Sequence, residues 1–361
     1  MLEAYIKKIN VNLEALLTDI NKRYRLNLVS DSLFYYSKEF VLRPGKRIRP
    51  LLFILAYHGY RHKKLTDPKG LFRCAASIEL LHDFMLIHDD VIDNSDLRRG
   101  KPTLHRLFDK NIKSSPNADI GKSLAIVAGD ILFAVAIEAF LSIKEDMARK
   151  ETALKKLVET AAYTGAGEFL DVTFGHKSID ALSEDMIFLN YTLKTAKYTF
   201  ECPLLMGAIL AGAGKNDLKN LSILGISAGQ AFQIYDDLLD LFSTEEVIGK
   251  PILTDLAESK KTLLVFKAYR GLHGKDKKLF MAIMEKDKKT LADLKLFREL
   301  IIKSGSHETV LKRLSELQKT AQAACRRLTM DPQHKKMVED VIAKLSPSRM
   351  PLNLNTPEQE K

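Results

Sequence analysis

Apolar residues recur at every third or fourth position along almost the whole chain. This spacing gathers them on one face of an α-helix, whereas a half-buried strand needs strict alternation. Alternating runs of Val, Ile and Thr are scarce, and no Asn-Gly pair marks a hairpin. The pattern predicts an all-α fold. The helices are expected near residues 2–24, 30–40, 47–62, 70–92, 120–144, 148–176, 183–211, 216–243, 259–272, 275–287, 290–303, 307–328 and 332–345.

A single domain over residues 1–345 is predicted, because no Pro- or Gly-rich linker divides the chain. The 361 residues are 46% hydrophobic, which is ample for one core. The last segment, residues 346–361, contains three prolines and many polar residues, so we expect a disordered tail there.

The formal net charge of +10 fits a nucleic acid, an acidic membrane or a small polyanionic substrate. The basic residues form no long run and no RNA-motif signature is present, so no nucleic-acid partner is expected. The three cysteines are far apart, which argues against a disulfide framework and favours a cytoplasmic location. The most apolar stretch, residues 124–140, contains two acidic residues, so we expect a buried helix and no transmembrane segment.

Two acidic motifs each end a long apolar, helix-patterned run. Both read Asp-Asp-x-x-Asp, and they cover residues 89–93 and 236–240. Residues four apart lie on one face of a helix, so the first and last aspartates of each motif point the same way. Carboxylates this close repel one another unless a cation lies between them, and a buried carboxylate without a partner is costly.

Oxygen ligands in small numbers suit Mg²⁺, which keeps several waters and shares the phosphate oxygens of a substrate. Two such motifs facing one cavity would hold a diphosphate through several magnesium ions. A single motif of this kind is usually a solvated acidic turn. Two copies amid Leu, Ile, Phe and Tyr, too far apart for a tandem repeat, favour the metal-binding interpretation.

A basic segment, residues 43–50, reads Arg-Pro-Gly-Lys-Arg-Ile-Arg-Pro. Its Pro-Gly pair marks a turn, after which Lys46, Arg47 and Arg49 cluster at the start of a predicted helix. Positive charge at a helix N-terminus is disfavoured, so we expect an anion to compensate it. Backbone amides with Lys and Arg make a phosphate site, and a solvated basic turn is the alternative.

Other cations accompany the acidic motifs. Arg98 and Arg99 follow the first motif in a loop and could fork onto phosphate oxygens. His82 lies two turns before Asp89, where a buried core histidine is the common alternative. Lys194 lies amid an apolar helix, and its alternative is a side chain that extends to the surface.

Two further segments could belong to the same site. Gly165 and Gly167 lie inside a predicted helix and cost about 1 kcal/mol each relative to Ala, which indicates close packing or room for a ligand. After the second motif, a turn-rich loop carries Lys250 and Lys260. This loop could close over bound phosphates as a lid, or it could be an ordinary basic surface loop.

Taken in order, these motifs resemble the trans-prenyl diphosphate synthases, the head-to-tail enzymes of isoprenoid chain elongation. The resemblance covers about Gly45 to Thr262. It implies the isoprenoid synthase fold, in which antiparallel helices surround a deep central cavity, and a homodimer. The implied reaction is the Mg²⁺-dependent condensation of isopentenyl diphosphate with an allylic diphosphate (dimethylallyl, geranyl or farnesyl) to give a longer all-trans prenyl diphosphate.

The resemblance also assigns roles to residues. The isopentenyl diphosphate would be held by Lys46, Arg49, His82 and Arg99. Three magnesium ions would be ligated by Asp89, Asp93 and Asp236, with help from Asp90, Asp237 and Asp240. The allylic diphosphate would be held by Arg98, Lys194 and Lys250, with Lys260 covering it and Thr195 and Gln233 near the reacting groups. The catalytic set would be Asp89, Asp93, Asp236, Lys194 and Arg98.

One residue departs from the family pattern. The family usually has Gln in Gly-Gln-x-x-Asp, whereas this chain has Glu168, followed by Asp171. The substitution adds a negative charge near the expected metals. It puts the local metal affinity in question and leaves the reaction class unchanged.

In this family, bulky residues shortly before the first acidic motif end the product tunnel and set chain length. Here Phe84 and Met85 occupy that place, with Leu81 one turn earlier, which implies a C15 or C20 product and slightly favours geranylgeranyl over farnesyl diphosphate. At ~100° per residue, Phe84 lies about 140° from Asp89, Met85 about 40° and Leu81 about 80°. The role of Phe84 therefore rests on the resemblance alone.

Two other classes of protein remain as alternatives. A class I terpene cyclase shares the first acidic motif, but its second normally reads Asn/Asp–Ser/Thr–Glu. A regulatory subunit of an active synthase is the alternative without enzymatic activity, and it should have lost aspartates or basic residues. The retained Asp89, Asp93 and Asp236 argue against both.

Overall fold

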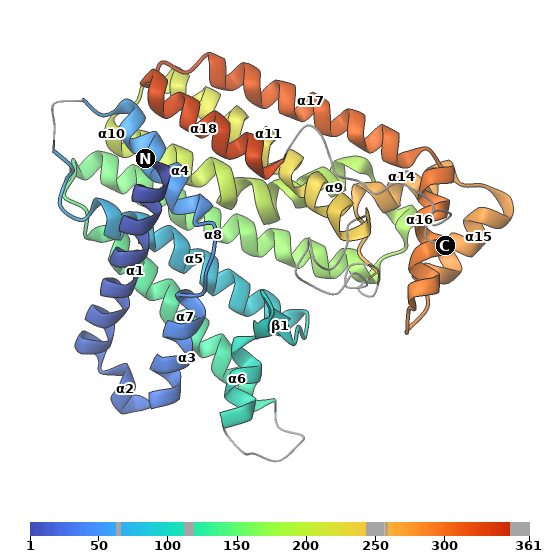
Figure 1. The fold of residues 1–361 in the computed structure, drawn as a ribbon, viewed down its shortest axis with the longest axis horizontal. Coiled ribbons are helices and arrows are strands. Elements are labelled where there is room, and N and C mark those ends of the chain that lie inside the picture. Colours follow the sequence, from blue (N-terminus) through green and yellow to red (C-terminus); the bar gives the residue numbers. More distant parts are fainter. Residues whose placement is uncertain (63–65, 112–118, 243–255, 257–258, 347–361) are drawn as a thin grey trace. The chain divides into compact units, whose positions relative to one another are not determined.

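The computed structural model describes residues 1–62, 66–111, 119–242, 256 and 259–346, and Figure 1 traces the chain. The fold is all-α, as predicted. The described residues form only one pair of short strands, β1 (Leu97–Arg98) and β2 (Lys101–Pro102), which are antiparallel with Arg98 opposite Lys101. Of the tail expected to be disordered, residues 346–361, all but Ser346 lie outside the described part of the chain.

The chain divides into two compact units, which are described separately below. The first contains Met1–Ala161, Thr199–Ser222 and Arg327–Glu339, and the second contains Ala162–Tyr198, Ile223–Arg326 and Asp340–Lys361. The acidic motif at 89–93 belongs to the first unit and the motif at 236–240 to the second. The prediction of a single domain over 1–345 stays a prediction.

The first unit is a bundle in which α5 packs along α7 and α4 packs along α10. The close approach of α4 and α10 depends on Gly207, where a Cβ would lie 2.3 Å from the carbonyl oxygen of Phe53. Small buried residues on α7 bring it close to α5 in the same way. Its helices are α1 (Leu2–Tyr24), α2 (Leu26–Val29), α3 (Asp31–Val41), α4 (Ile48–Tyr60), α5 (Leu71–Ile92), α6 (Leu104–Asn111), α7 (Ile120–Leu141), the start of α8 (Met147–His176), the end of η2 (Tyr191–Glu201), α10 (Cys202–Ala211), the start of α11 (Lys215–Phe242) and the start of α18 (Pro332–Leu345).

The second unit has its own apolar core, in which α14 packs on α17 and the rings of Phe280 and Phe297 stack with centroids 4.6 Å apart. Side-chain caps fix several helix starts, such as the capping box of Thr290 and Asp293 on α16. Its elements are the end of α8, the 3₁₀ turn η1 (Ile179–Ala181), α9 (Glu184–Asn190), most of η2 (Tyr191–Glu201), the end of α11, α14 (Leu263–Gly271), α15 (Gly274–Met284), α16 (Leu291–Lys303), α17 (Ser306–Arg326) and the end of α18 (Pro332–Leu345).

The helix predicted over 183–211 is three elements. After α9, the segment η2 is a π-helix, and α10 follows with Pro203 in its first turn. Apolar spacing of three and four does not signal a π-helix, which is rare and frequently lies at functional sites. Two short helices, α2 and α6, and the β1–β2 hairpin were not predicted, and α14 begins later than predicted because Thr262 caps it.

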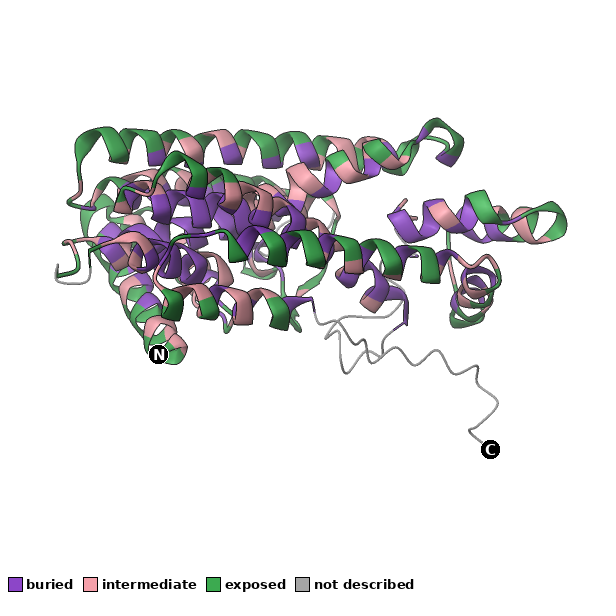
Figure 2. Ribbon diagram, turned by 90° about the horizontal axis from the view of Figure 1, so that it is seen from above, coloured by how far each residue is buried: buried purple, intermediate pink, exposed green. Residues whose placement is uncertain are grey.

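Buried residues lie along one side of most helices and exposed residues along the other (Figure 2). Among the described helices, α7 is long and apolar enough to cross a membrane, with a mean hydropathy of 2.2. In the most apolar 18-residue stretch of α7, 44% of the residues are buried inside the protein. Because the core helix of a globular protein passes the same test, α7 does not argue for a membrane span.

Candidate active site

The first acidic motif lies at the C-terminal end of α5, where Arg98 of β1 holds two of its aspartates. The Arg98 guanidinium donates from Nε to Asp90 Oδ1 (2.8 Å) and from Nη2 to Asp89 Oδ2 (2.9 Å). Asp93 is the residue that caps α5. Carboxylates at a helix C-terminus add to the negative end of the helix dipole, so this corner attracts cations.

Burial and ion pairing shift the pKa values of Asp90 and Arg98 at this end of α5. Burial raises the pKa of Asp90 to about 6, although Arg98 opposes the rise. Burial works against the charge of Arg98 too, but Asp90 and Asp89 outweigh it and raise the pKa of Arg98. The corner therefore holds carboxylates that gain from any added cation.

The basic segment at the start of α4 has two different kinds of arginine. Arg47 has a left-handed backbone (φ 49°) and is buried. Its guanidinium donates to Glu79 Oε1 at 2.7 Å, to Asn10 Oδ1 at 2.9 Å and to two backbone carbonyls. Arg47 therefore ties α1, α3 and α5 to the start of α4, and its donors are committed within the protein.

Arg49, in contrast, is half-buried and donates from Nη2 to Thr199 Oγ1 at 2.9 Å. Arg99 comes to the same turn, where its Nη1 donates to the carbonyl of Pro44 at 3.1 Å. The lack of a side chain at Gly45 permits this approach, because a Cβ there would lie 2.8 Å from Arg99 Nη1. Lys46 is exposed beside the turn.

His82 is buried on α5 next to these arginines. Burial, followed by Arg49, Arg99, Arg98 and Arg47, holds the pKa of His82 well below its usual value. A neutral imidazole is therefore present at neutral pH. The structure brings Arg49, Arg99 and His82 together in the first unit, with Lys46 at the edge; we call these four residues the basic cluster.

In the second unit, Lys194 of η2 lies between two carboxylates of α8. Its ammonium is 2.6 Å from Asp171 Oδ2 and 2.9 Å from Glu168 Oε2. Asn190 holds the other Asp171 oxygen at 2.9 Å. Gly167 allows η2 to come this close, because a Cβ there would lie 2.4 Å from the Lys194 backbone nitrogen.

The second acidic motif is surrounded by a hydrogen-bond network from η2. Asp237 accepts from the Tyr191 hydroxyl and, at 2.9 Å, from Gln233 Nε2. Thr195 Oγ1 in turn donates to Gln233 Oε1 at 2.6 Å. Asp237 and Asp240 are buried, and Asp236 is partly exposed.

Tyr191 was not among the predicted site residues. Burial, followed by the charge of Asp237, raises the pKa of Tyr191 well above its usual value. The hydroxyl therefore stays protonated and donates a hydrogen bond to Asp237. The oxygen also accepts from the Leu263 backbone nitrogen at 2.8 Å. A tyrosine at the start of an apolar helix gives no sequence signal for this role.

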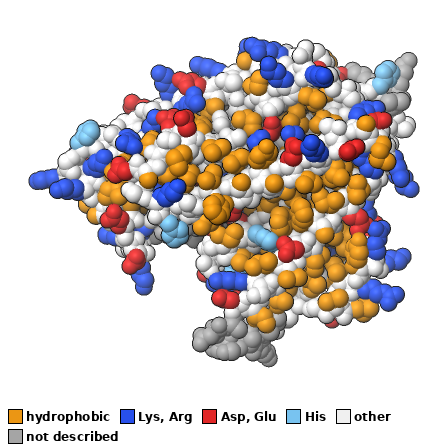
Figure 3. Space-filling view, turned by 180° about the vertical axis from the view of Figure 1, so that it is seen from behind, with side chains coloured by type: hydrophobic (Ala, Val, Ile, Leu, Met, Phe, Trp, Pro, Cys, Tyr) orange, Lys and Arg blue, Asp and Glu red, His pale blue; other side chains and the backbone are white. Residues whose placement is uncertain are grey.

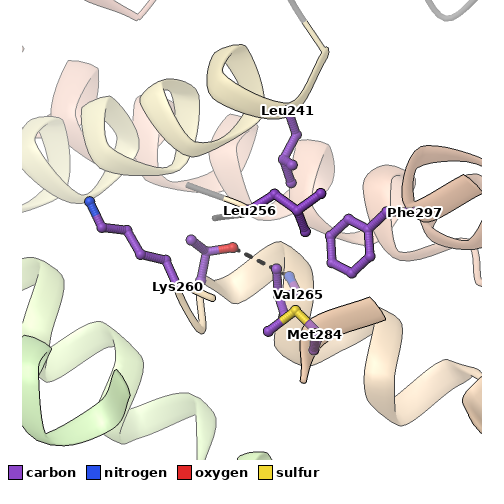
Figure 4. A pocket seen from close by; sticks show the side chains of 7 residues that line it. Leu241, Leu256, Lys260, Val265, Met284 and Phe297 are labelled. Carbon is purple, nitrogen blue, oxygen red and sulfur yellow. Dashed lines mark hydrogen bonds between the residues drawn. The ribbon is translucent and has the colours of Figure 1, made fainter. Parts of the chain in front are cut away.

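The loop after the second motif is described only in part. Lys250 lies outside the described residues. Lys260 is half-exposed and borders a small hollow (Figure 4). In Figure 4 its ammonium points away from the apolar side chains of the hollow. The lining is otherwise Leu241, Leu256, Thr262, Val265, Met284 and Phe297.

The residues expected to set chain length lie on α5. Leu81 is buried, and Phe84 and Met85 are half-buried. The Phe84 ring lies 5.2 Å from Phe133 of α7 and 4.6 Å from His88, measured between centroids. Phe84 therefore packs toward α7.

The donor set can be tested against Mg²⁺. No three His, Cys, Asp or Glu side chains gather as a preformed metal cage in the part of the chain that the structure describes. Mg²⁺ rarely uses such a cage, because it takes one or two carboxylates and completes its shell with water and phosphate oxygens. Asp89, Asp93, Asp236 and Asp240 supply this chemistry, so the residues fit the ion.

Comparison with known proteins decides the family. The family model described as polyprenyl synthetase matches residues 31–301. The chain belongs to the polyprenyl synthetase family. As a member, it is a prenyltransferase of the short-chain trans-prenyl diphosphate synthase type.

Individual polyprenyl synthetases support this assignment. The chain is 34% identical over 268 residues to a short chain isoprenyl diphosphate synthase of Methanothermobacter thermautotrophicus, covering 74% of this chain and 76% of that protein. It is 31% identical to a geranylgeranyl diphosphate synthase of Saccharolobus solfataricus, over 72% and 73% of the two chains. A geranylgeranyl pyrophosphate synthase of Corynebacterium glutamicum, solved with isoprenyl diphosphate and magnesium, has 26% identity and a TM-score of 0.87, over 97% of this chain and 100% of that one.

Proposed function

We propose that this prenyltransferase condenses isopentenyl diphosphate with an allylic diphosphate in the presence of Mg²⁺. The product would be an all-trans C15–C20 prenyl diphosphate, with geranylgeranyl slightly favoured over farnesyl. The observation that carries the proposal is the pairing of Arg98 with Asp89 and Asp90, since the cation and carboxylates that a metal-bound diphosphate needs already lie together.

The residues divide into two substrate sites under this proposal. The basic cluster would bind isopentenyl diphosphate, because guanidinium groups and an exposed ammonium match phosphate oxygens. Arg98, Lys194, Lys250 and Lys260 would bind the allylic diphosphate, with Thr195 and Gln233 nearby. We propose that both acidic motifs act on this one allylic diphosphate.

The proposed chemistry follows from these positions. Bound Mg²⁺, with three ions expected at Asp89, Asp93 and Asp236, would neutralise charge on the departing diphosphate. Arg98 and Lys194 would stabilise the same charge as the carbon–oxygen bond breaks. The basic cluster would hold the double bond of isopentenyl diphosphate near the allylic cation. The departing diphosphate, rather than a protein carboxylate, would take the final proton.

We further propose that Phe84, with Met85 and Leu81 beside it, ends the space for the growing chain. The half-buried Phe84 ring against Phe133 of α7 supports this role. A bulky ring at this place would stop elongation, because a longer tail would have to displace it.

A homodimer and a cytoplasmic location are also proposed. Hydrophobic side chains gather on the face drawn in Figure 3, which is typical of a surface that another chain covers. In the first unit, exposed apolar side chains on α7 and the start of α8 include Ile126, Val127, Leu141 and Val158. The cytoplasmic proposal rests on three buried cysteines, none of which forms a disulfide.

The test is product analysis. The purified protein is incubated with Mg²⁺, labelled isopentenyl diphosphate and, in separate reactions, dimethylallyl, geranyl or farnesyl diphosphate. We expect a C15 or C20 alcohol after dephosphorylation. Longer products would keep the reaction and overturn the proposed chain length.

Two outcomes would overturn the reaction itself. Consumption of farnesyl diphosphate without isopentenyl diphosphate, giving a hydrocarbon, would indicate a terpene cyclase. No turnover of any primer, together with tight binding to an active synthase, would indicate a regulatory subunit.

A further inference from the structure

Helix α5 carries a buried carboxylate that the proposed reaction does not use. Asp83 follows His82 directly, and only 3% of it is exposed. Its Oδ2 accepts no hydrogen bond from any described residue. A buried carboxylate oxygen without a hydrogen bond costs folding free energy, so the position calls for an explanation.

The charged groups that act on Asp83 include two arginines of the basic cluster. Glu79 lies one turn earlier on α5 and acts on Asp83 through its charge, as do Arg47, Arg49 and Arg99. Asp83 and Glu79 in turn act on the charge of Arg99. These groups come from the start of α4, from α5 and from the loop after β1.

Two kinds of charged group act on Asp83: a buried ion pair and two arginines of the basic cluster. Arg47 is bound to Glu79 at 2.7 Å, and both side chains are buried. Arg49 and Arg99 also act on Asp83 through their charges. Under the proposed function, the same two arginines bind isopentenyl diphosphate, so Asp83 and that substrate compete for them.

We propose that Asp83 acts as a proton-carrying group of the isopentenyl diphosphate site, taking up a proton as the diphosphate binds and releasing it as the diphosphate leaves. The inference rests on the proposed function and adds a pH-dependent control of substrate affinity. Asp83 is a positioning residue here, because it acts on the substrate through Arg49 and Arg99.

The direction of the effect follows from linkage. An ionised Asp83 repels the diphosphate, whereas a protonated one leaves both arginines to the substrate. Affinity should therefore fall as the pH rises, by up to about tenfold per pH unit. Burial, then Glu79, raises the pKa of Asp83 well above its ordinary value, against the opposing arginines, which moves the effect toward neutral pH.

The test is calorimetric titration of the whole protein with isopentenyl diphosphate alone, without an allylic primer. Measurements at about pH 7 to 9, in buffers of different ionisation enthalpy, give the number of protons taken up on binding. The variants are Asp83→Asn and, as a matched control, Asp19→Asn, an exposed aspartate of α1 whose partner is Arg73.

We expect proton uptake by the wild type and by Asp19→Asn, and a smaller uptake with a flatter pH dependence of affinity for Asp83→Asn. Equal uptake by Asp83→Asn would overturn the inference, since the substrate's own phosphate would then account for it. Should Asp83→Asn not fold, absence of uptake by the wild type over this pH range would overturn it equally. Failure of the proposed function differs, because the wild type would then bind no isopentenyl diphosphate at all.

Discussion

At the residue scale, Lys194 is held by two carboxylates where the family pattern provides one. Glu168 and Asp171 both lie within 3 Å of its ammonium. The three side chains carry a net negative charge, so an incoming diphosphate must compete with two carboxylates for Lys194. The substitution of Gln by Glu in the motif thus acts on a cation of the proposed allylic site as well as on the metals.

Glu168→Gln should therefore release Lys194 in part. We expect the KM for the allylic diphosphate to fall about fivefold, which corresponds to about 1 kcal/mol for one charge-assisted contact. Glu159→Gln, a half-exposed glutamate on the same helix, is the control. An unchanged or higher KM in steady-state kinetics would show that Glu168 does not restrain Lys194.

Asp83→Asn tests the charge state of Asp83 through stability. Its pKa is raised in the folded protein, so the folded state keeps a proton that the unfolded chain releases near its ordinary pKa of about 4. Stability is therefore lost as the pH rises from about 4 through the folded pKa. Asp83→Asn should be more stable than the wild type at about pH 8, with a smaller gain toward pH 4. Urea unfolding at both pH values that shows no such trend would contradict it.

At the element scale, two arginines at the start of α4 have different roles. Arg47 holds the helix start in place, and Arg49 is proposed to bind substrate. Arg47→Ala would leave Glu79 buried without its partner, so we expect a loss of about 3–5 kcal/mol of unfolding free energy. Arg49→Ala removes a half-buried contact to Thr199, so we expect a loss below about 1.5 kcal/mol and a raised KM for isopentenyl diphosphate. Urea unfolding gives the loss of stability of each variant, and steady-state kinetics give its KM for isopentenyl diphosphate. Equal destabilisation by Arg47→Ala and Arg49→Ala would contradict the different roles of the two arginines.

The packing of α5 against α7 sets the expected product length. Phe84→Ala should lengthen the product by at least one five-carbon unit, because it removes the ring that contacts Phe133. Phe72→Ala, the same substitution near the other end of α5, is the control and should leave the product unchanged. Chromatography of the dephosphorylated products gives the answer, and an unchanged profile for Phe84→Ala would remove Phe84 as the end of the tunnel.

The helices themselves were largely predictable, because their apolar faces repeat with the period of the α-helix. The limits of α1, α5 and α8 were predicted within one or two residues. The π-helix η2 was not, because apolar spacing of three and four gives no signal for π-type hydrogen bonding. The hydrogen bonds of Arg47 and the surroundings of Asp83 likewise depend on residues that are distant in sequence, such as Asn10 and Arg99. The spacing of residues along the sequence does not predict that these come close.

At the scale of the whole molecule, the proposed chemistry needs both compact units. The first supplies the motif at 89–93 and the basic cluster, and the second supplies the motif at 236–240 and Lys194. Family membership supports one reaction that uses all of them. The central proposal is therefore that Mg²⁺-dependent binding of diphosphate needs both acidic motifs.

Calorimetric titration with inorganic diphosphate in the presence of Mg²⁺ tests this claim most directly. The wild type is compared with Asp89→Asn and Asp236→Asn, and with Asp19→Asn as the control. We predict a metal-dependent diphosphate site in the wild type and the control that either motif variant loses or weakens strongly. Retention of wild-type metal-dependent binding by either variant would contradict the central proposal.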